Sequence, residues 1–187
     1  MLEAHLDTTI DALTALIEGT RDDQLANRTP CAMWTVRDLI NHVAGGGHLF
    51  AAAFRGEEVP MPAGMPDFLG DSPSQGWKAS IEDFRSALPP AGERDRMATL
   101  PFGTMPISVA LDIATLDLMT HCWDLATATG QTPNLDPSAV EAAAAAAPHM
   151  IPPEGRMPET FGPVVEVADS APALDRLVAW LGRNPTA

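Results

Sequence analysis

The chain has 187 residues, of which 25 are acidic and 11 are basic, and its formal net charge is −14. A surface with this charge repels phosphate backbones, which argues against a nucleic-acid-binding protein. The hydrophobic content of 45% is enough for the core of one domain, and charged residues or proline interrupt every apolar run before it reaches the length of a membrane span, so we expect a single domain over residues 1–187 that does not cross a membrane.

The first segment is typical of an amphipathic helix. Apolar residues recur at intervals of three and four from Leu2 to Ile17, which predicts a helix over about residues 2–18. Its early acidic residues do not resemble a secretory signal peptide. The two cysteines, Cys31 and Cys122, stand far apart in the sequence, which favours free thiols in a reducing compartment over a disulfide. We therefore expect a cytoplasmic protein.

A capping box predicts the start of the second helix. Thr35 is followed three residues later by Asp38, and the apolar pattern continues to about Phe54. His42 falls on an inward-looking face of this helix, where it is either a hydrogen-bonded core histidine or a ligand. Three consecutive glycines, 45–47, each cost roughly 1 kcal/mol relative to alanine inside a helix. We interpret them as a need for space beside the backbone rather than as a break in the helix.

The next segment, residues 56–74, is a long connection rich in proline. Loops of this length are often lids or rims of binding sites, and the alternative is a surface crossover between two helices. A third helix is predicted over about residues 74–88, because its apolar positions keep helical spacing and Pro89 and Pro90 then end it. A short extended piece is expected between residues 94 and 102.

The most informative stretch is LDIATLDLMTHCWDLATATG, residues 111–130. It contains no proline, it ends at a glycine suited to stop a helix, and it is apolar on nearly every side, which predicts a buried helix. Asp117 and His121 are four residues apart and share one face, and Asp124 falls on the same stripe. Burial requires that their charges be compensated. A divalent cation would do this, and so would a carboxylate–imidazolium pair without metal.

The last third of the chain is predicted to add short elements to this scaffold. An alanine-rich helix is expected over residues 137–147, a strand over FGPVVEVA at residues 161–168, and a final helix over residues 171–181. The expected fold class is all-α. Its core is four main helices within residues 1–130, with additions over residues 131–187 that include at most one short strand or hairpin.

Three of these residues form a candidate metal site. His42, Asp117 and His121 are ligands suited to zinc or a similar divalent ion, and catalytic zinc sites commonly use three such ligands and leave one position open. Asp124 has two open interpretations. It orients a ligand histidine, as hydrogen-bonded carboxylates often do, or it is a buried acid paired with an arginine, for which Arg37 and Arg176 are candidates.

Other residues near these motifs receive a structural interpretation. Trp34 and Trp123 are expected in the core rather than facing a ligand. Cys31 and Cys122 are of a type that binds soft metals, but Cys122 is rotated about 100° from His121 on a helix. We interpret both cysteines as packed thiols.

Two segments carry a resemblance to a known family. TPCAMWTVRDLINHVAGG and LPFGTMPISVALDIATLDLMTHCWDLATATGQ are similar to the metal-binding four-helix domain of mycothiol-dependent maleylpyruvate isomerase, in the DinB-like superfamily. LDRLVAWLGRNP resembles the end of small stand-alone members of that group. The resemblance implies a DinB-like four-helix bundle whose metal is held by His42, Asp117 and His121. The acidic ligand is commonly glutamate in the isomerase, and Asp117 is one methylene shorter.

The function implied by this resemblance is a metal-dependent thiol transferase or isomerase. The metal would be zinc, with nickel as an alternative, mycothiol would be the thiol cosubstrate, and the partners would be a small-molecule thiol or electrophile. The isomerase continues into a second domain, whereas only about 40 residues follow the alanine-rich helix here, so its own reaction does not transfer. Two alternatives stay open: a non-catalytic module that binds a metal or small ligand, including as a homodimer, and a helical scaffold that has lost its metal.

Overall fold

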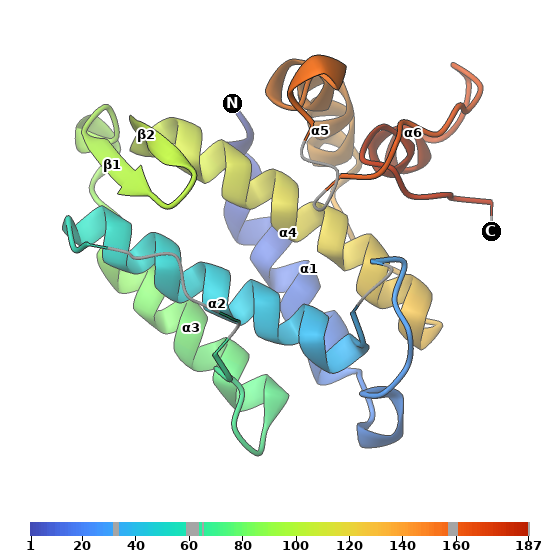
Figure 1. The fold of residues 1–187 in the computed structure, drawn as a ribbon, viewed down its shortest axis with the longest axis horizontal. Helices are drawn as coiled ribbons and strands as arrows, with labels where there is room; N and C mark the ends of the chain where they lie inside the picture. The colour runs from blue at the N-terminus through green and yellow to red at the C-terminus, as the bar shows by residue number, and fades with distance from the viewer. Residues whose placement is uncertain (32–33, 59–63, 65, 157–160, 187) are drawn as a thin grey trace.

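The computed structural model describes residues 1–31, 34–58, 64, 66–156 and 161–186. These residues form six α-helices and a two-stranded antiparallel sheet (Figure 1). In chain order the elements are α1 (Leu6–Glu18), α2 (Val36–Arg55), α3 (Pro73–Ala87), β1 (Met97–Leu100), β2 (Gly103–Pro106), α4 (Ile107–Thr129), α5 (Pro137–Met150) and α6 (Ala173–Trp180). Short 3₁₀ turns lie at Leu2–His5, Asp22–Gln24, Ala91–Glu93 and Pro153–Gly155.

Local capping sets the ends of the two helices that matter most. The Thr35 hydroxyl accepts a hydrogen bond from the Asp38 backbone N–H, and the Asp38 carboxylate accepts one from the Thr35 N–H, which confirms the predicted capping box of α2. Gly130 ends α4 with a φ of 69°, in the left-handed conformation that glycine adopts without steric cost. The predicted end of α4 is therefore confirmed, whereas its start lies at Ile107 rather than at Leu111.

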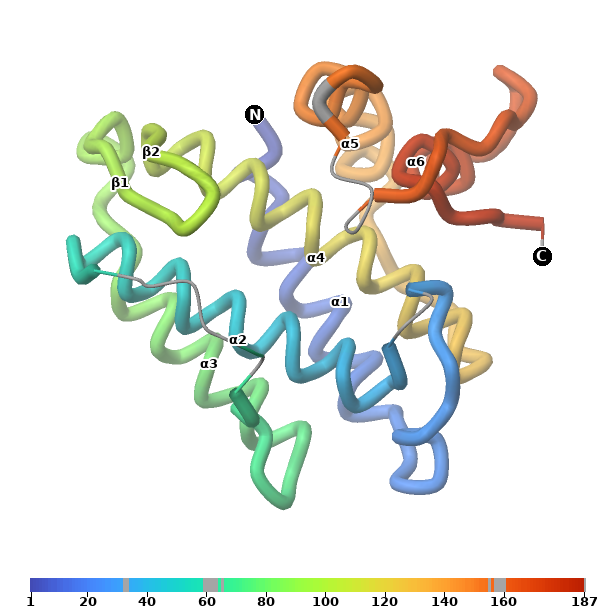
Figure 2. Tube along the Cα trace, in the orientation of Figure 1, coloured from blue at the N-terminus to red at the C-terminus, as the bar shows by residue number. Residues whose placement is uncertain are grey.

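The helices pack in two groups around α4. In the first group α2 packs on α3 and α1 packs on α4, and α2 also contacts α4 (Figures 1 and 2). In the second group α5 and α6 pack on each other and contact the other side of α4. Leu111 and Leu125 of α4 belong to the core shared with α1–α3, whereas Leu116 and Met119 belong to the core shared with α5 and α6. Because α4 lies between two cores, it is apolar on nearly every side.

The expected strand at residues 161–168 is wrong. Those residues have no regular secondary structure and pair with no other strand among the described residues, and the Val165 N–H instead donates to the Ala179 carbonyl of α6 at 2.9 Å. The strands form earlier, as a hairpin in which Met97 pairs with Pro106 and Leu100 with Gly103. Of the extended piece expected between residues 94 and 102, only Met97–Leu100 forms a strand, which is β1. Valine-rich sequence favours extended backbone, but a strand also needs a partner edge.

No helix among the described residues combines the length and the apolar character needed to traverse a bilayer.

A polar cluster fastens α2 to α3. His48 Nδ1 lies 2.6 Å from Asp83 Oδ2, and Arg55 donates to Asp83 Oδ1 at 2.6 Å. The hydrogen bond from His48, followed by that from Arg55, outweighs the effect of burial and holds the pKa of the Asp83 carboxyl below its usual value. The carboxylate therefore stabilises the packing of these two helices.

We predict that Asp83→Asn lowers the free energy of unfolding by about 1 kcal/mol at neutral pH. Because the folded-state pKa lies below the unfolded value of about 3.9, the carboxylate stabilises the fold above that pH and loses this contribution as the pH falls through its lowered pKa. Urea unfolding of both proteins from pH 7 to pH 3 should show the difference shrinking in acid. The exposed Asp71→Asn is the control, and an equal loss there would contradict the prediction.

Candidate metal centre

Three predicted ligands from two helices lie together in the structure. His42 Nε2 of α2 is 3.5 Å from Asp117 Oδ2, and His121 Nε2 is 3.4 Å from Asp117 Oδ1 on α4. One donor atom from each residue lies within 4.8 Å of the other two. The two imidazole rings meet edge to face, with their centroids 4.9 Å apart. The structure therefore brings together the set that the sequence proposed.

The local sequence explains why these side chains meet. Asp117 and His121 share a face because they are one turn apart on α4, and His42 reaches them from α2, which packs against α4. The helix α2 runs through glycines 45–47 without a break, as expected. A Cβ on Gly45 would lie 2.7 Å from the Phe68 ring, and one on Gly47 would lie 2.2 Å from Ser80 Oγ of α3. These two glycines therefore allow Phe68 and α3 to pack tightly on α2.

The distances fit a tetrahedral ion better than they fit strong hydrogen bonds. A charge-assisted hydrogen bond is about 2.7–2.9 Å long. Ligand atoms that stand about 2.0–2.2 Å from a tetrahedral zinc ion lie about 3.4 Å from one another. The observed separations of 3.4 and 3.5 Å are close to the second value, but each runs to a different oxygen of Asp117, and one donor atom from each of the three residues lies within 4.8 Å of the others. The donor set of two imidazoles and one carboxylate is also one that zinc uses.

The three side chains differ in their access to solvent. The His121 side chain is 4% exposed, whereas those of His42 and Asp117 are 31% and 42% exposed. The Trp34 ring stacks on the His42 ring with centroids 4.6 Å apart, so this tryptophan borders the site rather than lying only in the core as expected. One candidate ligand is thus held inside the protein, and the other two lie where a small molecule can reach them.

A chain of buried hydrogen bonds orients His121. Its Nδ1 lies 2.9 Å from Asp124 Oδ2, and the same oxygen accepts a hydrogen bond from Arg183 Nη2 at 2.9 Å. With Nδ1–H donating to Asp124, the Nε2 lone pair of His121 is directed toward the Asp117 side. Asp124 therefore fits both interpretations at once, because it orients a histidine and pairs with an arginine. The arginine is Arg183, because Arg37 pairs with Asp67 and Arg176 with Glu141.

The pKa values in this group reflect the same contacts. Burial alone would raise the pKa of the Asp124 carboxyl, but the His121 hydrogen bond and the Arg183 guanidinium outweigh it and hold the pKa at about 2. Burial would likewise lower the pKa of His121 and raise that of Asp117. The attraction between these two groups reverses both shifts. His42 further lowers the pKa of Asp117, and the hydrogen bond with Asp124 further raises that of His121. Without a metal ion this arrangement is the carboxylate–imidazolium pair, and a metal would replace the proton on His121.

Sequence reasoning missed one residue of this site, Arg183, and interpreted a second, Cys31, as a packed thiol. The Cys31 thiol donates to Asp124 Oδ2 at 3.2 Å and lies 3.3 Å from Arg183 Nη2, so it is not simply a packed thiol. Cys31, His121 and Asp124 form a second group of potential ligand atoms, but Asp124 is already engaged by Arg183. The segment LGRNP after α6 was the available signal for Arg183. Cys122 is fully buried, and burial raises the pKa of its thiol.

The connection at residues 56–74 is fastened to α2 at its return end. Asn41 donates from Nδ2 to the Pro66 carbonyl and accepts from the Phe68 N–H through Oδ1, both at 2.8 Å. Residues 59–63 and 65 lie outside the described residues. The lid and the surface crossover therefore both stay predictions for this connection.

Known proteins share this fold and much of this sequence. A family model described as mycothiol maleylpyruvate isomerase N-terminal domain matches residues 6–126, which include all three candidate ligands and Asp124. Uncharacterized proteins of Mycobacterium tuberculosis strains CDC 1551 / Oshkosh and ATCC 25618 / H37Rv are each 37% identical over 175 residues, 93% of this chain and 93% of each relative.

Two solved structures resemble this one in fold. Mycothiol-dependent maleylpyruvate isomerase superposes with a TM-score of 0.60 at 16% identity, and a histidine-to-alanine mutant of it superposes with a TM-score of 0.62 at 14% identity. Each match covers 78% of this chain and 68% of the isomerase chain. At such low identity the likeness shows a common fold.

We predict that Arg183→Met lowers the free energy of unfolding by about 3 kcal/mol, because it leaves the Asp124 carboxylate buried and unpaired with an arginine. Combining it with Asp124→Asn should recover part of the loss, since the unpaired buried carboxylate is then absent. Urea unfolding of the two single variants and the double variant measures this coupling. Arg176→Met, which breaks the exposed pair with Glu141, should cost no more than about 1 kcal/mol. Equal costs for the two arginine variants would contradict the assignment.

Proposed function

This chain belongs to the family defined by the mycothiol maleylpyruvate isomerase N-terminal domain, and from that premise we propose that it is a divalent-metal-binding protein that activates a small-molecule thiol. In this proposal α1–α4 are the DinB-like four-helix bundle of the family. His42, Asp117 and His121 hold the ion, which is zinc, with nickel as the alternative. The two free cysteines fit a reducing compartment, and the cytoplasm is the proposed location.

The observation that carries the proposal is the spacing of the ligand atoms. Asp117 presents one oxygen to each histidine at 3.4 and 3.5 Å, and both histidines offer Nε2. Three protein ligands with an accessible side are the arrangement of catalytic zinc sites, in which the remaining position takes water or substrate.

The residues around the proposed ion have different roles. A divalent ion held by His42, Asp117 and His121 would lower the pKa of a thiol bound to it and so would supply a reactive thiolate. His121 is held rigidly through Asp124 and Arg183, which fixes the direction of its Nε2. Trp34 restricts the ring of His42 by stacking on it, while Asp117 stays accessible from the open side. The structural relatives are mycothiol-dependent, which supports mycothiol as the thiol and a transferase or isomerase reaction on a small electrophile.

Metal content tests the ligand set directly. We predict about one equivalent of zinc or nickel per chain in the purified protein and at least tenfold less in His42→Ala, because a site with two ligands binds the ion weakly. His48→Ala is a matched control, since it removes a histidine from the same helix that pairs with Asp83 instead. Elemental analysis by mass spectrometry gives the ratio, and circular dichroism checks that each variant is folded. Unchanged metal in His42→Ala would remove this residue from the site.

Thiol activation is tested separately from metal binding. We predict that the metal-loaded protein accelerates the reaction of mycothiol with a model electrophile such as 1-chloro-2,4-dinitrobenzene, and that a chelator abolishes the acceleration. Absorbance of the thioether product measures the rate. Bound metal with only the spontaneous rate, or equal rates with and without chelator, would favour the non-catalytic binding module instead.

A further inference from the structure

Gly46 has no packing role that explains it. Its neighbours Gly45 and Gly47 are required because a Cβ on either would collide with Phe68 or with Ser80. A Cβ on Gly46 would meet no atom of the described residues within 4 Å. A glycine inside a helix costs about 1 kcal/mol relative to alanine. The space beside Gly46 is therefore open in the described part of the chain, and no packing contact there accounts for this cost.

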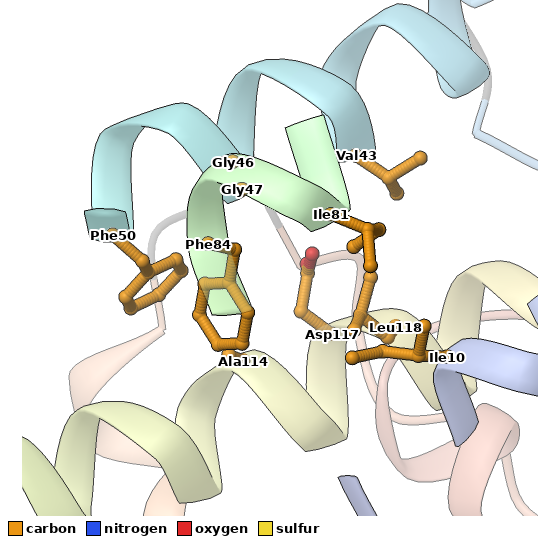
Figure 3. Close-up of a pocket in the computed structure, with 10 residues that line it drawn as sticks. All are labelled: Ile10, Val43, Gly46, Gly47, Phe50, Ile81, Phe84, Ala114, Asp117 and Leu118. Carbon is orange, nitrogen blue, oxygen red and sulfur yellow. The ribbon is translucent and has the colours of Figure 1, made fainter. Parts of the chain in front are cut away.

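This space opens onto a cavity of about 20 Å³ between α1, α2, α3 and α4 (Figure 3). Its walls include Phe50, Ile81, Phe84 and Ala114, and among the described residues that line it only Asp117 has a polar side chain. The cavity has room for about one group of the size of water. A water molecule there would find few hydrogen-bond partners, whereas a methyl group would contact apolar side chains on several sides.

The cavity adjoins the candidate metal centre. Asp117 is both a wall of the cavity and a candidate ligand. Gly46 is one helical turn beyond His42 on α2, and Ala114 is one turn before Asp117 on α4, so two small residues lie next to two ligands. Figure 3 shows the Asp117 carboxyl group amid the apolar side chains of the pocket. A molecule that reached the metal from the solvent-accessible side of Asp117 would therefore lie beside this cavity.

We propose that Gly46 keeps open an apolar slot for a short alkyl group, about the size of a methyl, carried by the molecule that binds at the metal. The slot selects thiols or electrophiles with such a branch close to the metal-binding atom. A charged group at the same place is disfavoured, because the walls are apolar and the Asp117 carboxylate repels anions. This inference rests on the proposed metal site and adds to it the size and polarity of the substrate.

The test uses the full chain loaded with Co²⁺ and a series of n-alkanethiols from two to five carbons. The sulfur-to-cobalt charge-transfer band gives each Kd without any activity measurement. In the wild type we expect affinity to rise about fourfold for each methylene that enters the cavity, and to level off after one or two. Gly46→Val should remove this gain while leaving one Co²⁺ per chain. Ala52→Val, which adds the same side chain to α2 away from the cavity, should keep it.

Two further measurements separate the slot from the metal site. Gly46→Ala fills the space partly, gains helix stability because its Cβ meets no atom, and should show an intermediate gain. Methane, which has the size of the proposed methyl group, should bind to the metal-free wild type under gas pressure, as measured by NMR, and this binding should be lost in Gly46→Val. The same thiol dependence or the same methane binding in Gly46→Val as in the wild type would overturn the slot. Absence of Co²⁺ binding by the wild type would instead overturn the proposed function, whatever methane shows.

Discussion

The buried carboxylate of Asp124 is the constraint on which the rest of the structure depends. Its side chain has no exposure to solvent, and an isolated charge in such a place is strongly unfavourable. Three groups compensate it: the His121 ring, the Arg183 guanidinium and the Cys31 thiol. These contacts fix the His121 ring in one orientation and dock the chain after α6 against α4. One charge therefore links the candidate metal centre to the end of the described chain.

The two acids on the same stripe of α4 have different tasks because their surroundings differ. Asp124 is enclosed and shared between a histidine and an arginine, so its oxygens are not free for a ligand. Asp117 is one of the more accessible side chains of the site, and its oxygens face two imidazoles at distances longer than a strong hydrogen bond. Spacing along the helix placed both acids on one face, but only the three-dimensional contacts distinguish the candidate ligand Asp117 from Asp124, which orients His121.

Features that depend on interactions between residues close in the sequence could be predicted, whereas features that depend on contacts between distant residues could not. Helical spacing and capping act over a few residues, so α2, the end of α4 and the shared face of Asp117 and His121 were predictable. Pairing across the chain was not, because Arg183 lies 59 residues from Asp124 and nine other arginines would have suited it equally by charge. The same limit explains the strands. The sequence of residues 161–168 favours extended backbone, but no partner strand meets it among the described residues. Residues 97–106 instead form a hairpin in which the two strands pair with each other. That His42 meets α4 depended on the packing of α2, which periodicity alone does not specify.

The family match ends at residue 126, yet Arg183 supports a residue inside the match. The described residues after α4 are therefore more than an addition to the helical scaffold. They cover Leu116 and Met119 of α4. Arg183 also compensates the charge of Asp124, which lies near the C-terminal end of the same helix. Since a buried pair that loses one partner is strongly destabilising, α6 and the segment that follows it are energetically coupled to the orientation of His121. The relatives that are 37% identical align over 93% of this chain, so the similarity extends beyond residues 6–126, which the family model matches.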